Sequence, residues 1–198
     1  MIMRVLILIM MVLSAKISFA ETPWYAGAGV GMTSYQGDSL NNVPAASIDV
    51  DGWETGFNLF GGYQFNERWA VELGYTDFGE TEDFDPNGQI LGIGVNFESS
   101  GFYLNGQYHI PLNNSLSLDL VGGWLFGEAD AKEVFPPNTA GTPQSASFTD
   151  NGATLGLAFT WQMSRSFGLR GTANYYMIDY DNTIKKPWRL GADLIWNF

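Results

Sequence analysis

Hydrophobic and polar residues alternate one by one along several stretches of this chain, and the clearest stretch covers residues 58–76. On its first half, Tyr63 and Phe65 share an apolar face, and on its second half Val71 and Leu73 do the same. The residues between them are small or polar, and a short polar break separates the two halves. Period-two alternation on both sides of a tight break predicts an antiparallel β-hairpin.

Six further segments alternate in the same way, which gives eight strands of about ten residues, the length that a tilted strand needs to cross a bilayer. Long polar connections alternate with short turns, as expected when one end of a barrel faces the periplasm and the other faces the exterior. The predicted strands cover residues 24–33, 58–65, 69–76, 101–110, 116–126, 154–163, 167–176 and 188–198. The long connections cover residues 34–53, 80–88 and 128–148, and residues 90–98 form a weak extension of the fourth strand.

An apolar strand face is either the core of a soluble sandwich or the lipid-facing side of a membrane barrel, and the tryptophans distinguish the two. Six of the seven lie on apolar faces near strand ends, which is the girdle pattern of a protein with two membrane interfaces. The opposite faces are rich in Gly, Ala, Thr, Asn and Gln, which suits a crowded polar lumen. The pattern therefore predicts an all-β protein, a closed eight-stranded antiparallel up-and-down transmembrane β-barrel. The six tryptophans are Trp24, Trp69, Trp161 and Trp196 at the short-turn end and Trp124 and Trp188 at the loop end.

The first twenty residues differ in kind from the rest of the chain. Arg4 precedes an unbroken apolar run, Val5–Leu13, and Ser18–Ala20 is a small-x-small cleavage site. This arrangement predicts a secretory signal peptide over residues 1–20, because nine apolar residues are too few for a membrane anchor. The barrel domain is then expected over residues 21–198, after export through the periplasm.

The charge of the chain excludes one class of partner. The formal net charge is −12, and loss of the two basic residues of the leader makes it more negative. Nucleic-acid binding depends on cationic contacts to phosphates, so we expect no nucleic-acid partner. The absence of cysteine fits an exported protein without disulfides.

Residues 60–79, FGGYQFNERWAVELGYTDFG, resemble the second and third strands of the outer membrane protein A transmembrane domain. WYAGAGVG from Trp24 and LVGGWLF from Leu120 resemble its first and fifth strands, and small OmpX-like barrels share the architecture. The resemblance implies a cell outer membrane location, with membrane lipid and lipopolysaccharide as surroundings. The final Phe198 resembles the signal that the barrel-assembly machinery reads. Because the chain ends at the barrel, the family's peptidoglycan-binding domain and its cell-wall tethering are not expected.

The resemblance also implies a network of charged side chains inside the barrel. Glu72 matches an interior carboxylate of the family, whereas Gln107 replaces the family's fourth-strand lysine. The family's seventh-strand arginine has no counterpart near Thr172, but Arg170 lies two residues earlier on the same face. The candidate interior network consists of Glu72, Asp119, Arg170, Arg189 and Asp193.

The turn of the last hairpin fixes how the seventh and eighth predicted strands pair. Inward residues are even-numbered on the seventh strand and odd-numbered on the eighth. A turn centred between Asp181 and Asn182 then places Arg170 opposite Asp193, provided that no bulge shifts the ladder.

Catalytic and metal chemistry find little support in the sequence. His109 is the only histidine, and with Pro111 two residues later we expect no serine near it for a Ser-His-acid triad. A zinc site needs three or four ligands, which one histidine and no cysteine do not supply. No cofactor is expected. The acidic connections either hold Ca²⁺ or Mg²⁺ or are simply solvated, and the solvated alternative is favoured. Their candidate cation contacts are Glu80, Glu82, Asp83 and Asp85, and a second acidic group is Glu128, Asp130 and Glu133.

Two functions remain. The first is a monomeric structural and surface-interaction barrel whose lumen is filled by Tyr25, Phe60, Tyr103, Leu125 and Tyr176. The second is a small pore or transporter, which is disfavoured because the interior of eight strands is just wide enough for side chains. A lipid-modifying enzyme is the least favoured.

Overall fold

The computed structural model describes residues 23–37, 52–84, 94–134, 145–180 and 184–198. The predicted signal peptide, Asp85 and the turn at Asp181 and Asn182 lie outside these residues. Among the described residues, no helix is long and apolar enough to cross a membrane.

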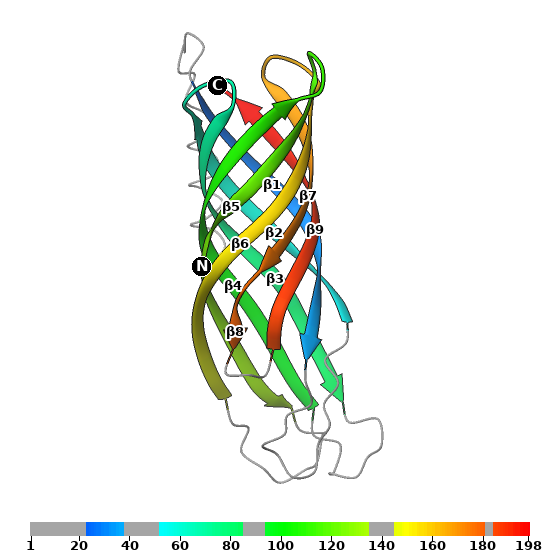
Figure 1. Ribbon diagram of the computed structural model, residues 1–198. Coiled ribbons are helices and arrows are strands. Elements are labelled where there is room, and N and C mark those ends of the chain that lie inside the picture. The colour runs from blue at the N-terminus through cyan, green and yellow to red at the C-terminus, as the bar shows by residue number, and fades with distance from the viewer. Residues whose placement is uncertain (1–22, 38–51, 85–93, 135–144, 181–183) are drawn as a thin grey trace.

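The described residues form a single antiparallel sheet whose first and last long strands also pair with each other. The strand order is β1-β2-β3-β4-β5-β6-β7-β9, and the two-residue β8 pairs with β9 as a continuation of β7. The sheet is therefore a closed barrel with eight walls, as predicted (Figure 1). The strands are β1 (Trp24–Gly37), β2 (Gly52–Gln64), β3 (Trp69–Phe84), β4 (Gly94–Pro111), β5 (Leu116–Val134), β6 (Ser145–Gln162), β7 (Phe167–Tyr176), β8 (Asp179–Tyr180) and β9 (Ile184–Asn197).

The barrel is staggered and narrow. A path along directly paired residues starts at Trp24 on β1 and returns to β1 at Ser34, ten residues further on. Such a stagger makes the strands tilt, and with eight strands it leaves an interior just wide enough for side chains. The path runs through Trp24, Tyr63, Val71, Gly106, Gly122, Leu155, Tyr175, Trp188 and Ser34.

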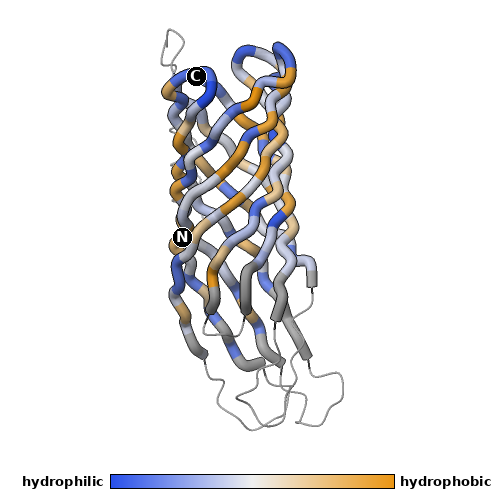
Figure 2. The backbone as a smooth tube through the Cα atoms, viewed as in Figure 1, coloured by the Kyte–Doolittle hydropathy of each residue, from blue (hydrophilic) through white to orange (hydrophobic). Residues whose placement is uncertain are grey.

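The two faces of the wall differ as the alternation predicts. Large apolar side chains such as Val30, Leu73 and Phe102 point outward and are 62% exposed. The lumen side holds the buried residues, both polar and apolar. Figure 2 shows this alternation of hydropathy along the strands. An apolar exterior around a polar interior is the arrangement of a membrane barrel.

The strands extend further at the loop end than predicted. Part of each of the three predicted long connections therefore lies in strands. Strand β2 already begins at Gly52, and Trp53 points outward and packs edge-to-face on Trp188 at 4.8 Å. The sequence prediction followed apolar alternation, which ends at the membrane surface, whereas the hydrogen-bonded ladder continues beyond it. The acidic residues predicted in connections but lying in strands are Glu80, Glu82 and Asp83 in β3 and Glu128, Asp130 and Glu133 in β5.

A β-bulge in β3 changes which side chains face the lumen. The ladder with β4 shifts between Asp77 and Gly79, and Gly79 has a φ of 92°, a left-handed conformation that favours glycine. The Gly79 amide donates to the Asp77 carboxylate at 2.8 Å. Simple alternation from Glu72 would turn Glu80 inward, but the extra residue turns it to the exposed outer face and leaves Phe78 buried in the lumen.

Candidate functional site: a charged layer across the lumen

An ion pair joins opposite walls of the barrel. Glu72 lies on β3 and Arg170 on β7, four strands apart around an eight-walled barrel. Arg170 Nη1 donates to Glu72 Oε2 at 2.7 Å, and Nη2 donates to Oε1 at 3.3 Å. The two residues are only 3% and 2% exposed, so the pair lies out of contact with bulk water. Two parallel hydrogen bonds from a guanidinium to a carboxylate are among the strongest polar contacts in proteins.

Three further side chains donate to the Glu72 carboxylate. They are Gln107 Nε2 at 2.8 Å, the Tyr103 hydroxyl at 3.0 Å and the Tyr25 hydroxyl at 3.4 Å. Gln107 occupies the position at which the family resemblance expects a lysine, so a neutral amide contacts the carboxylate there. With these donors the carboxylate is fully engaged, which is the condition under which a buried charge is tolerated.

The register of the last hairpin brings a second carboxylate to Arg170. Arg170 is directly opposite Asp193, and Tyr175 is opposite Trp188, which confirms the predicted register. Arg170 Nε donates to Asp193 Oδ2 at 2.9 Å. The guanidinium also lies 4.3 Å from the centroid of the Phe60 ring, a cation–π distance.

Arg189 joins the layer through an amide rather than an ion pair. Asn58 Nδ2 donates to Asp193 Oδ1 at 3.1 Å, and Arg189 Nη2 donates to Asn58 Oδ1 at 3.2 Å. Sequence reasoning missed Asn58 as the connection, although its even-numbered position on β2 puts it in the lumen. Within the described parts of the chain, no carboxylate lies within ion-pair distance of Arg189, and its Nε has no hydrogen-bond partner. The layer as a whole contains two carboxylates and two guanidinium groups.

Asp119 belongs to a separate cluster near the short turns. His109 Nδ1 lies 2.8 Å from Asp119 Oδ1, which also accepts a hydrogen bond from Ser117 at 2.8 Å. Thr160 donates to the other carboxylate oxygen at 2.6 Å. The expectation of no serine near the histidine was wrong, because the β4–β5 pairing places His109 opposite Asp119, and Ser117 two residues earlier on β5 donates to the same carboxylate. The Ser117 hydroxyl donates to the acid and not to the imidazole, which is not the hydrogen-bond chain of a triad.

Two cavities meet at Arg170. A cavity of about 200 Å³ lies towards the short turns and is lined by Gln107, His109 and Gln162 among others. A cavity of about 20 Å³ lies on the other side and is lined by Glu72 and Arg189 among others. Arg170 lines both cavities, so the ion pair separates them.

The acidic loop-end residues that the structure describes lie along strands β3 and β5. Of the predicted cation contacts, Glu80, Glu82 and Asp83 follow one another along β3, and Glu80 accepts a hydrogen bond from Asn96. In the described residues no group of three or more His, Cys, Asp or Glu side chains is arranged to hold a metal ion.

A closed barrel with an apolar exterior, two aromatic girdles and a buried polar lumen defines an integral outer membrane protein. The model of one protein family, described as the outer membrane protein β-barrel domain, matches residues 5–195. The chain belongs to this family and is located in the cell outer membrane.

Individual relatives support the same class. Outer membrane protein A of Shigella flexneri is 27% identical over 133 residues, which is 66% of this chain and 33% of that protein. The chain therefore spans about a third of the length of this curated relative.

Solved structures share the fold at low sequence identity. Ail, the attachment invasion locus protein of Yersinia pestis, solved with the heparin analogue sucrose octasulfate, has a TM-score of 0.59 at 19% identity. The comparison covers 89% of this chain and 99% of Ail. A major outer membrane protein from Thermus thermophilus has a TM-score of 0.64 at 12% identity, with 88% of this chain and 99% of that protein covered.

Proposed function

We propose that this protein is a structural and surface-interaction barrel of the outer membrane whose lumen is closed by its own side chains. The observation that carries the proposal is the Glu72–Arg170 ion pair, which spans the lumen from one wall to the opposite wall at 2.7 Å. An ion that passes this level has to separate the pair, and separation leaves two buried charges exposed to a medium that solvates them poorly.

The surroundings of the pair support closure. Asp193 and Gln107 hold the two charged groups from the sides, and Phe60 covers the guanidinium. Movement of Glu72 or Arg170 out of the lumen would break these hydrogen bonds and the contact with Phe60. Glu72 and Arg170 themselves are fully hydrogen-bonded, and satisfied polar groups of this kind make a buried site rigid. The proposed role is therefore stabilisation of the barrel and of the membrane around it, without catalysis.

The proposed partners are membrane lipid, lipopolysaccharide and, during assembly, the barrel-assembly machinery, with the protein acting as a monomer after its signal peptide is removed. Phe198 supports the assembly role: its amide donates to the Trp24 carbonyl at 3.2 Å, and its ring packs on Trp196 at 4.8 Å. The final aromatic residue therefore lies where the last and first strands close the barrel.

We do not extend the heparin analogue of the Ail structure to this chain. On β3, β4 and β5 the outer face near the loop end carries Glu80, Glu98, Glu128 and Asp130, and Lys132 is the one Lys or Arg in the described residues of these three strands. The whole chain has a net charge of −12. Such a surface repels a sulfated polyanion.

A small pore is the second candidate, and one observation favours it. The cavity of about 200 Å³ penetrates from the short-turn end as far as Arg170, so part of a path through the barrel already exists.

Single-channel recording separates the two candidates. Protein refolded into planar lipid bilayers is expected to give no conductance steps, whereas regular steps from the unmodified protein would overturn the closed lumen. Insertion is checked independently by protease protection of the same preparation. This control shows that an absence of conductance does not result from an absence of inserted protein.

A further inference from the structure

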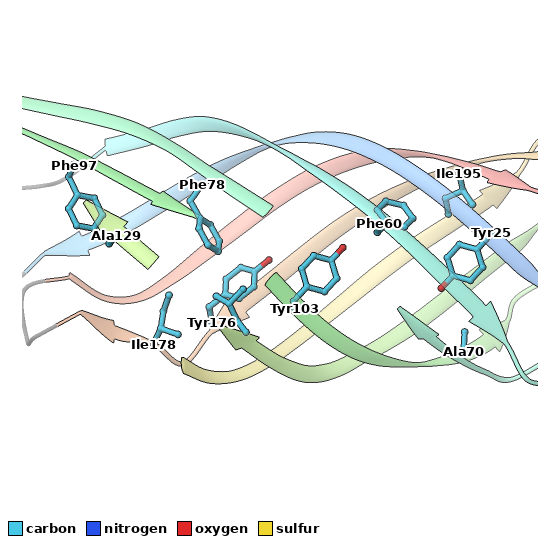
Figure 3. Packing of buried hydrophobic residues seen from close by; sticks show 11 residues of the cluster. Tyr25, Phe60, Ala70, Phe78, Phe97, Tyr103, Ala129, Tyr176, Ile178 and Ile195 are labelled. Atoms are coloured by element: carbon cyan, nitrogen blue, oxygen red, sulfur yellow. The ribbon is translucent and has the colours of Figure 1, made fainter. Parts of the chain in front are cut away.

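Beyond the charged layer, the loop end of the lumen is closed a second time by apolar side chains. Phe78 on β3 and Tyr176 on β7 come from opposite walls, and their ring centroids lie 5.0 Å apart in an edge-to-face contact. Phe78, Leu125 and Ile178 are completely buried. Figure 3 shows Phe78, Tyr176 and Ile178 close together in the interior, at a distance from Tyr25 and Ile195.

The walls used by this second contact are the walls used by the ion pair. Glu72 and Phe78 are both on β3, and Arg170 and Tyr176 are both on β7. Phe97 from β4 and Ala129 from β5 are also buried and extend the apolar cluster towards the loops.

The chemistry of the lumen changes between the two closures. The small cavity between them is lined by polar groups, and several of these have no hydrogen-bond partner, as expected where an internal water completes the bonding. The cluster around Phe78 contributes no charged side chain. An ion that reaches this level has to give up its water with no charged side chain of the cluster to replace it, and hydrophobic constrictions block ions in this way. The unpartnered atoms that line the cavity are Thr76 Oγ1, Asn105 Oδ1, Asn174 Oδ1 and Arg189 Nε.

We propose that Phe78, Phe97, Leu125, Tyr176 and Ile178 form an apolar seal that closes the loop end of the lumen independently of the Glu72–Arg170 pair. The inference rests on the proposed closed lumen and deepens it, because it gives the lumen two barriers of different chemistry. Breaking the ion pair alone then leaves the barrel closed to ions from the exterior.

The first test measures access to the space between the barriers. The chain has no cysteine, so Thr76→Cys introduces a single thiol beside the small cavity. In detergent-folded protein we compare its reaction rate with a charged methanethiosulfonate reagent in two backgrounds. The seal variant carries Phe78→Ala and Ile178→Ala, and the control carries Phe102→Ala and Met177→Ala, which remove exposed lipid-facing side chains nearby.

The seal variant is expected to react about tenfold faster or more, a change that corresponds to about 1.4 kcal/mol of protection, while the control keeps the slow rate. Equal rates in the two backgrounds overturn the seal, whether or not the unmodified protein conducts. A result that overturns the seal is therefore distinguishable from one that overturns the proposed closed lumen. If the double seal variant does not fold, Phe78→Ala alone is compared with Phe102→Ala.

The second test measures conductance in planar bilayers. Glu72→Gln combined with Arg170→Gln removes the charges and is expected to remain silent, whereas the same change with Phe78→Ala and Ile178→Ala is expected to conduct. Conductance from the charge variant alone, at the level of the combined variant, shows that the apolar residues are no barrier and overturns the seal. A silent combined variant whose insertion is verified also overturns it.

Discussion

Replacement of Glu72 by alanine tests the charged layer most directly. The change removes an acceptor of two hydrogen bonds from Arg170 and of one each from Tyr25, Tyr103 and Gln107. Removal of one partner of a buried ion pair costs about 3–5 kcal/mol, because the other charge stays buried. Arg170 retains Asp193 at 2.9 Å, so we expect a loss near the lower limit, about 3 kcal/mol of unfolding free energy.

Urea unfolding in lipid vesicles, followed by tryptophan fluorescence, measures this loss. The matched control is Glu98→Ala, which breaks a 3.8 Å ion pair with Lys132 in which both side chains are more than half exposed. Exposed pairs contribute about 1 kcal/mol or less. Arg170→Ala should cost more than Glu72→Ala, because it leaves two carboxylates without their shared cation. A loss from Glu72→Ala no larger than that from Glu98→Ala would refute the buried network.

Three further outcomes follow from the structure. Gly62→Ala should destabilise the folded barrel by about 1–3 kcal/mol, because its Cβ would lie 2.0 Å from the Tyr25 ring. Gly122→Ala, with no atom within 4 Å of its Cβ, is the neutral control, and equal urea midpoints for the two variants would contradict the packing. Asp119→Ala should cost about 1–3 kcal/mol in the same titration, since it leaves the half-buried hydroxyl of Thr160 without its acceptor, and an unchanged midpoint would speak against that cluster. In detergent the folded protein should show a β-type circular dichroism spectrum and run faster on gels unheated than boiled; a soluble monomer in plain buffer would be incompatible with the membrane barrel.

The register of β7 and β9 could be predicted because parity restricts it so strongly. A slip of one residue would turn either Arg170 or Asp193 to the lipid face, so only odd sums of paired residue numbers keep both side chains in the lumen. The assumption of a regular ladder was nevertheless wrong. Asp179 pairs with Lys185, one residue out of step with the pairs below, so an irregularity follows Tyr176. The inward charges keep the membrane part in register despite it.

The apolar residues inside the loop end were predicted only in part. Parity placed Leu125 and Tyr176 in the lumen, and the same parity extended along β3 and β4 also turns Phe78 and Phe97 inward. These two were left out because the sequence prediction ended the third strand at residue 76 and gave residues 90–98 only a weak extension of the fourth strand. One signal was available for the bulge. Gly79 interrupts a strand pattern directly after Asp77 and Phe78, and a glycine inside a strand indicates a bulge. The Asn58 connection required the three-dimensional register of three strands.

The charged residues inside the barrel and those on its outer face near the loop end differ in how they affect stability. Inside, two carboxylates and two guanidinium groups balance one another in a layer that donors satisfy. Outside, Glu80, Glu98 and Asp130 face one another directly across β3, β4 and β5, and opposed like charges destabilise a sheet. Lys132 offsets Glu98 only at 3.8 Å, and water and salt screen the remainder. The strands that carry this repulsion are those that continue past the loop-end girdle. The repulsion adds nothing to the stability of the barrel, which agrees with the proposed surface-interaction role of the acidic outer face of β3–β5.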